Sequence, residues 1–87
     1  MKSKTTPAFR KLYDSLPRHI QKRAKKSYEL WKQDSQHPSL YYKNIRNNIY
    51  SVRIGLGWRA LGLHKGEYMA WFWIGSHADY NNLVNRL

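Results

Sequence analysis

Two arginines flank one tight turn of the chain. Arg53 precedes the segment Gly55-Leu56-Gly57 and Arg59 follows it. Alternation along an extended strand places Arg53 on the face opposite the apolar side chains beside it. Antiparallel strands joined by such a turn can bring both guanidiniums to one patch, where each offers a planar fork of N–H donors. The spacing predicts a clamp for a phosphate, although two ordinary solvated strand arginines would show the same pattern.

His77 is the second candidate for chemistry. It follows Gly75 and Ser76 at the end of the most apolar run of the chain, where a rigid strand is expected to meet solvent. An imidazole near neutral pH can act as a general acid or a general base. A lone histidine is also common as a plain polar surface residue, so the sequence leaves both interpretations open.

Most other catalytic chemistries lack their residues. The chain has no cysteine, which excludes thiolate nucleophiles, disulfides and thiolate metal sites. It has no paired-histidine helix motif, so we expect no metal and no cofactor. The five acidic residues are scattered singly, which disfavours a two-carboxylate mechanism. Ser76 and His77 are neighbours whose side chains point apart, so a histidine-activated serine is not expected.

The charge balance indicates an anionic partner. Sixteen Lys and Arg against five Asp and Glu give a formal charge of +11, beyond the magnitude of ~2–8 usual for small domains. Such a charge suits nucleic acid, an anionic membrane or an acidic protein, and solubility alone remains an alternative. No apolar run approaches the ~20 residues that span a bilayer. The N-terminus leads into no apolar signal region, so we expect a cytoplasmic protein.

The length predicts a single domain over residues 1–87. Residues 1–6 are expected to form a short basic arm, residues 7–15 a short helix, and residues 17–34 a second helix. In the second helix an apolar stripe recurs at helical spacing, formed by Ile20, Ala24, Tyr28 and Trp31. Basic residues fill its other faces: Arg18, Lys22, Arg23, Lys25, Lys26 and Lys32.

The second half of the chain has the pattern of strands. We expect four strands, over residues 40–45, 49–54, 58–64 and 68–74, and a short C-terminal helix over residues 77–87. The connecting turns are expected at Asn47-Asn48, Gly55-Leu56-Gly57 and Lys65-Gly66. Together these elements predict an α+β fold, with two N-terminal helices packed on one face of a three- to four-stranded antiparallel sheet.

Three segments, taken in order, resemble the RelE/ParE superfamily of bacterial toxins. The run Ile49 to Gly62 (IYSVRIGLGWRALG) resembles the core Y-x-V-R-I-G-x-x-Y-R, with Trp58 replacing the common Tyr. Upstream, HPSLYYK from His37 resembles the entry H-P-S-L-x-x-K. Downstream, WIGSHADY from Trp73 resembles the closing I-G-x-H-x-x-Y. The resemblance extends over roughly residues 8–84.

The resemblance implies the toxin of a type II toxin–antitoxin pair. RelE-like members are ribosome-dependent endoribonucleases that cut mRNA without a metal, which inhibits translation. ParE-like members share the fold but poison DNA gyrase and cut no RNA. An inactive nucleic-acid-binding relative is a third possibility. The implied partners are an acidic antitoxin, mRNA and ribosomal RNA, with the toxin a monomer when free and a hetero-oligomer with its antitoxin.

The resemblance also suggests roles for individual residues. Arg59 matches the strand arginine that supports the scissile phosphate, and Arg53 matches a second basic strand position. His77 and Tyr80 fall where the ribonucleases place their last catalytic groups, His77 as acid or base and Tyr80 as a stacking ring or proton donor. Nucleic-acid contacts are expected from Lys43 and from the helix residues Arg18, Lys22, Arg23, Lys25 and Lys26. Two features depart from RelE: Ser51 stands where RelE has a lysine, and residues 1–6 are short and polar where RelE opens with a strand.

Overall fold

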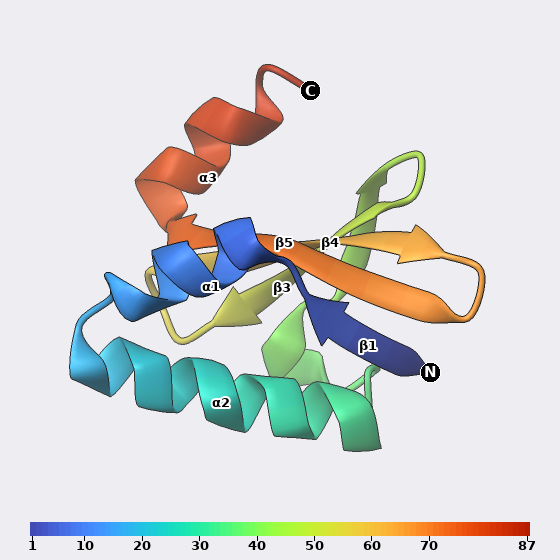
Figure 1. Cartoon of the computed structure of the whole chain (residues 1–87), viewed down its shortest axis with the longest axis horizontal. Helices are drawn as coiled ribbons and strands as arrows, with labels where there is room; N and C mark the ends of the chain where they lie inside the picture. Colours follow the sequence, from blue (N-terminus) through green and yellow to red (C-terminus); the bar gives the residue numbers. More distant parts are fainter.

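The computed structural model describes all 87 residues and contains three α-helices, five strands and one 3₁₀ turn (Figure 1). In chain order these elements are β1 (Lys2–Thr5), α1 (Pro7–Asp14), α2 (Arg18–Gln33), η1 (Pro38–Leu40), β2 (Lys43–Arg46), β3 (Ile49–Ile54), β4 (Trp58–Lys65), β5 (Tyr68–Ser76) and α3 (His77–Val84). None of the helices is long and apolar enough to span a membrane.

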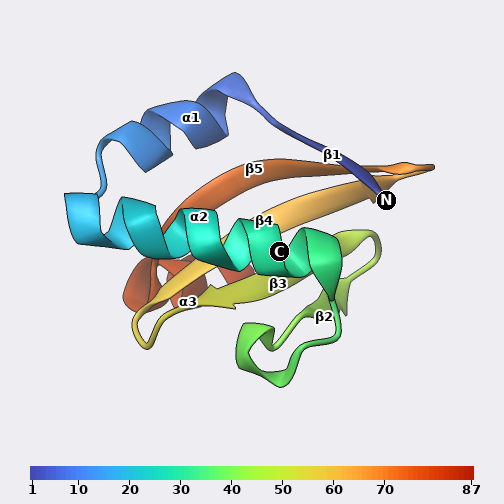
Figure 2. The same ribbon diagram turned by 90° about the horizontal axis from the view of Figure 1, so that it is seen from below.

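The five strands form one sheet in the order β1-β5-β4-β3-β2. Strands β2 to β5 are antiparallel neighbours, whereas β1 pairs with β5 in parallel. Helices α2 and α3 lie on opposite sides of this sheet (Figure 1), and α1 lies beside β5 (Figure 2). The predicted α+β fold, with its N-terminal helix pair and short C-terminal helix, is confirmed.

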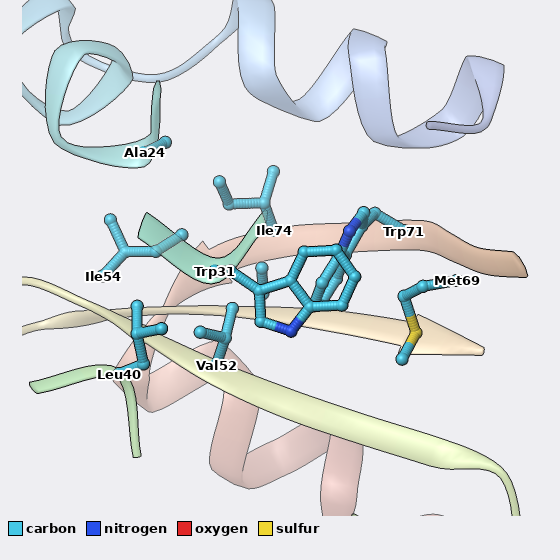
Figure 3. Packing of buried hydrophobic residues seen from close by; sticks show 9 residues of the cluster. Ala24, Trp31, Leu40, Val52, Ile54, Met69, Trp71 and Ile74 are labelled. Atoms are coloured by element: carbon cyan, nitrogen blue, oxygen red, sulfur yellow. The ribbon is translucent and has the colours of Figure 1, made fainter. Parts of the chain in front are cut away.

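The core lies between α2 and the sheet, as the apolar stripe of the second helix predicts. Ala24 and Trp31 are buried there, and the ring of Trp31 meets the ring of Trp71 edge to face at 5.2 Å (Figure 3). Val52 and Ile54 project into the same cluster. Because side chains alternate along β3, Arg53, which lies between Val52 and Ile54, must point to the other face of the sheet.

The expectation of a basic arm over residues 1–6 is wrong, because Lys2–Thr5 is strand β1. Its backbone is fixed at both ends: the Lys2 N–H donates to the Glu67 carbonyl at 3.1 Å, and the Thr6 N–H to the Trp71 carbonyl at 3.0 Å. Ser3 turns toward the helices and its hydroxyl hydrogen-bonds that of Tyr28. The sheet therefore has five strands rather than three or four, and the chain does open with a strand.

The expected strand over residues 40–45 is also corrected. Pro38–Leu40 forms the 3₁₀ turn η1, and Tyr41 follows with a φ of 45°, a left-handed conformation that no strand contains. Strand β2 therefore begins only at Lys43. The β4–β5 hairpin turn is Gly66-Glu67, one residue later than expected, because Lys65 pairs directly with Tyr68. The C-terminal helix ends at Val84 rather than Leu87.

Candidate functional site

Arg53 and Arg59 lie directly opposite each other on the face of the sheet turned away from α2. The register of β3 and β4 pairs these two residues, and the same ladder pairs Ile54 with Trp58 beside the turn. Side chains of directly opposed residues share one face at Cβ separations of about 4.5–5.5 Å. The convergence that the sequence predicted for these arginines is thus present in the fold. We call Arg53 and Arg59 the arginine pair.

Each guanidinium uses part of its donor fork on the backbone. The Arg53 Nε–H donates to the Gly55 carbonyl at 2.9 Å, and an Arg59 terminal N–H donates to the Trp58 carbonyl at 3.0 Å. These bonds fix both side chains next to the β3–β4 turn, yet a guanidinium has five N–H donors. None of the five strands contains an acidic residue. The sheet itself therefore supplies no carboxylate to neutralise the pair.

Aromatic rings flank the arginine pair on both sides. The Arg53 guanidinium lies 5.0 Å from the centroid of the Tyr41 ring, and that of Arg59 lies 5.8 Å from the centroid of the Tyr80 ring. His77 stacks on Tyr80 with centroids 6.1 Å apart and planes 19° apart. These five residues form a continuous row, which we call the arginine–tyrosine array. It brings together Arg53, Arg59, His77 and Tyr80, all four of the predicted catalytic residues.

The surroundings of Arg59 disfavour the charged form of its guanidinium. Burial lowers the pKa of Arg59 from its usual value, the positive charge of Arg53 lowers it further, and Tyr80 opposes the shift. An arginine remains charged at any physiological pH despite such a shift. The folded protein therefore holds two like charges together at a cost, and a bound anion would relieve that cost.

Helix α3 begins in a way that fixes the backbone of His77. The Ser76 hydroxyl accepts a hydrogen bond from the Asp79 N–H at 3.1 Å and so caps the helix. The His77 N–H donates to the Gly57 carbonyl at 2.8 Å, which ties the first residue of α3 to the β3–β4 turn. His77 itself is exposed. A rigid strand end therefore presents an accessible imidazole, as the sequence predicted.

Gly75 is required where β5 approaches this site. A Cβ on Gly75 would lie 2.6 Å from the ring of Trp73, which stacks over that position. Gly75 also pairs with Arg59 across the ladder. The absence of a side chain therefore lets Trp73 pack close to the backbone beside the arginine pair.

The predicted nucleic-acid-binding residues fall into two groups. Lys43 pairs with Ser51 and so shares the face of the arginine pair, two residues along β3 from Arg53. The helix residues lie on α2, across the sheet from the array (Figure 1); they are Arg18, Lys22, Arg23, Lys25 and Lys26. Arg23 is the exception in this group, because its guanidinium lies against Gly55 in the turn that also anchors Arg53.

Tyr41 is the member of the array that the sequence did not indicate. It is 62% exposed, and it reaches Arg53 because its left-handed backbone turns the chain between η1 and β2. Neither an apolar periodicity nor a charged neighbour in the sequence indicates that Tyr41 belongs to the array. The closest signal is its place in the HPSLYYK segment, directly after a Pro-Ser-Leu turn.

One apolar cavity of the protein lies away from the array. About 370 Å³ of space separates α1 and α2 from the sheet, with walls that include Phe9, Tyr28, Trp31 and Trp71. Of the sequence-predicted site residues only Lys25 borders it. No group of three or more His, Asp or Glu side chains lies close enough to hold a metal ion. The four predicted catalytic residues therefore lie outside this cavity.

One protein-family model matches the sequence. It describes a ParE-like toxin domain and covers residues 18–82, which include every member of the arginine–tyrosine array. The chain belongs to the ParE-like toxin domain family. The family places it in the RelE/ParE superfamily of toxins from toxin–antitoxin systems, as the resemblance of its three sequence segments indicated. No curated protein matches the sequence.

Solved toxin structures share the fold of this ParE-like domain. The RelB–RelE antitoxin–toxin complex from Methanococcus jannaschii aligns with a TM-score of 0.72, at 21% identity over 91% of this chain and 95% of that chain. The isolated E. coli RelE toxin gives 0.67, at 13% identity over 98% and 96%. The RelE–RelB complex from Pyrococcus horikoshii OT3 gives 0.66, at 13% identity over 87% and 93%.

Proposed function

We propose that this toxin is a metal-independent endoribonuclease that cuts mRNA on the ribosome, with the arginine–tyrosine array as its active site. The observation that carries the proposal is the pairing of Arg53 with Arg59 on a carboxylate-free sheet, next to an accessible imidazole at the start of α3. Two constrained guanidiniums beside a proton-transfer group are what phosphodiester cleavage without a metal requires.

In this mechanism the 2′-hydroxyl of the RNA attacks the adjacent phosphorus. The P–O5′ bond breaks, which leaves a 2′,3′-cyclic phosphate and a 5′-hydroxyl. The arginine pair stabilises the negative charge that builds on the phosphoryl oxygens. His77 either removes the 2′-hydroxyl proton or donates a proton to the departing 5′-oxygen. The lowered pKa of Arg59 supports this assignment, because perturbed groups cluster at functional sites.

Tyr80 is better suited to positioning than to contact with a base. It is buried at 8% exposure, and it has Arg59 and His77 as neighbours. A ring in this place sets the orientation of both groups. Exposed Tyr41 has an accessible ring beside Arg53 and is the better platform for stacking an RNA base.

A second candidate function is poisoning of DNA gyrase without catalysis. The observation that favours it is the family itself, since the matching description is ParE-like rather than RelE-like. A gyrase poison needs basic residues but no general acid or base. The role of His77 therefore separates the two functions.

The decisive experiment tests the purified toxin separately on mRNA-programmed ribosomes and on DNA gyrase. Programmed ribosomes carrying a defined mRNA are assayed by primer extension, and gyrase is assayed by trapped double-strand breaks. If the toxin is a ribonuclease, we expect mRNA cleavage without trapped DNA breaks. We also expect His77→Ala to abolish the mRNA cleavage. Trapped breaks that persist in His77→Ala, without mRNA cleavage, would establish the second function instead.

We further propose that an acidic antitoxin neutralises the toxin by covering basic surface. The formal charge of +11 supports this partner, and two of the similar solved structures are antitoxin–toxin complexes. Electrostatic steering should make the association rate fall at least about tenfold from low to high salt. Stopped-flow mixing at several ionic strengths measures it. An association rate that does not change with salt would contradict an electrostatically matched partner.

A further inference from the structure

We propose that Lys2, Lys4, Lys65 and Tyr68 form a second contact for single-stranded RNA. They lie on the sheet face turned away from α2, at the end remote from the arginine pair. We call these four residues the distal patch. The inference rests on the proposed ribonuclease function and extends it, because it gives the RNA strand a second point of contact on this toxin.

The sheet register places the distal patch on the face of the arginine pair. Along β4, residues of odd number share one face from Arg59 to Lys65. Lys65 pairs with Tyr68 across the hairpin, and Tyr68 pairs with Lys2 across the parallel β1 ladder. Three adjacent strands therefore contribute one row of side chains. Ser3, between the two lysines of β1, turns to Tyr28 on the helix side, which confirms that Lys2 and Lys4 face the other way.

Two ammonium groups converge on one exposed ring. The Lys2 Nζ lies 5.8 Å and the Lys4 Nζ 5.6 Å from the centroid of the Tyr68 ring, and Tyr68 is 43% exposed. Both distances are close to the ~6 Å limit of a cation–π contact, so each exposed contact is weak. Between positions 35 and 78 the only acidic residue is Glu67, in the adjacent turn. The patch therefore presents an exposed aromatic ring with two ammonium groups beside it.

An exposed ring with mobile cations around it suits a nucleotide better than a protein side chain. Lysine side chains are long and flexible, so they can move from the ring to a phosphate while a base stacks on Tyr68. Binding of single-stranded nucleic acid combines these two elements, a positive track for the backbone and an aromatic platform for bases.

The path from the arginine pair to the distal patch is not covered by a helix at its far end. Helix α3 lies at one end of the sheet, and the β4–β5 hairpin extends away from it (Figures 1 and 2). From Arg59 to Lys65 the strand advances about 20 Å at its usual rise per residue. A few nucleotides of extended RNA cover such a distance, so one strand can reach both contacts.

The first test measures binding without cleavage. Fluorescein-labelled oligoadenylates, lengthened one nucleotide at a time from a dinucleotide, are titrated against the toxin in a His77→Ala background. We expect the affinity to rise in two steps, the second when the strand reaches Tyr68. Tyr68→Leu should remove the second step and weaken the longer oligonucleotides at least about fivefold, the lower limit for one stacked base. Tyr68→Phe keeps the ring and should retain the step.

The lysines provide an independent variant that removes no buried atoms. Lys4→Ala should weaken only the oligonucleotides long enough to reach the patch. The matched control is Lys11→Ala, an exposed lysine of α1, which should weaken all lengths slightly and alike. If Tyr68→Leu and Lys4→Ala both bind every length as the parent does, the distal patch does not exist.

Cleavage on ribosomes separates this inference from the function on which it rests. When the mRNA is shortened from one end until it no longer reaches Tyr68, cleavage by the wild type should become slower. The cleavage rate of Tyr68→Leu should not change with that shortening. A second rise in affinity with oligonucleotide length, without any mRNA cleavage, would support the distal patch and contradict the proposed ribonuclease function. Normal cleavage with no effect of Tyr68→Leu at any length would contradict the patch and leave the ribonuclease in place.

Discussion

The arginine pair and the exposed surface of α2 are both strongly basic, but their cations are held differently. The α2 cations are exposed along the helix and lie across the sheet from the array. Arg53 and Arg59 are half-buried, hydrogen-bonded to backbone carbonyls and flanked by tyrosine rings. Helix α2 has more cationic side chains than the arginine pair. The two guanidiniums of the pair, however, are held in place by hydrogen bonds and by tyrosine rings. The two regions therefore differ in how firmly the fold holds their cations, and not only in how many cations they contain.

The largest effect should come from His77→Ala. Loss of a general acid or base typically costs ~10²–10⁴ in rate. His77 is exposed at the first turn of α3, so the free energy of unfolding should change by no more than ~0.5 kcal/mol. Single-turnover cleavage on programmed ribosomes and a thermal melt measure both quantities. Full activity in this variant would make His77 a structural residue of the array.

Arg59→Met should lower cleavage by ~10²–10³ without lowering stability. The first effect follows from the loss of a charge that stabilises the transition state. The second follows from the lowered pKa of Arg59, because a group whose charged form is disfavoured by folding does not stabilise the folded state in that form. Single-turnover cleavage on programmed ribosomes measures the first effect, and a thermal melt measures the second. A fall in the melting temperature of more than ~4 °C, about 1 kcal/mol in a domain of this size, would show that the arginine supports the fold instead.

Lys22→Ala is the matched test on α2, and its effect should be the smallest. One exposed phosphate contact among several is lost, so ribosome binding should weaken a few fold for all mRNAs alike. The slope of log affinity against log salt should decrease by about one. Binding measured across a salt series detects this change. A loss of cleavage as large as that of Arg59→Met would remove the distinction between the two basic regions.

Much of the site could be predicted because it depends on local patterns. Alternation in β3 sends Arg53 away from the core, and the glycine turn returns the chain so that Arg59 must lie opposite. Both consequences follow from a period of two and one tight turn. His77 could be located from a similar local pattern, because it follows Gly75 and Ser76 at the end of the most apolar run of the chain.

The features that the sequence did not predict depend on contacts distant along the chain. Strand β1 contains only Lys-Ser-Lys-Thr, which has no apolar pattern, and it forms because the backbone of β5 offers a free edge. Tyr41 joins the array through a left-handed backbone turn that its own residue type does not favour. Neither feature has an apolar or periodic pattern in the sequence, so neither could be predicted from alternation alone.

Our proposal that the arginine–tyrosine array cuts RNA can be tested in a single cleavage experiment. Defined mRNA on programmed ribosomes is incubated with wild type, Arg59→Met and Lys22→Ala, and the ends of the products are identified. We predict 2′,3′-cyclic phosphate and 5′-hydroxyl ends from the wild type, near-normal rates for Lys22→Ala and a loss of at least about a hundredfold for Arg59→Met. Intact mRNA with the wild type, or equal rates for Arg59→Met and Lys22→Ala, would contradict it.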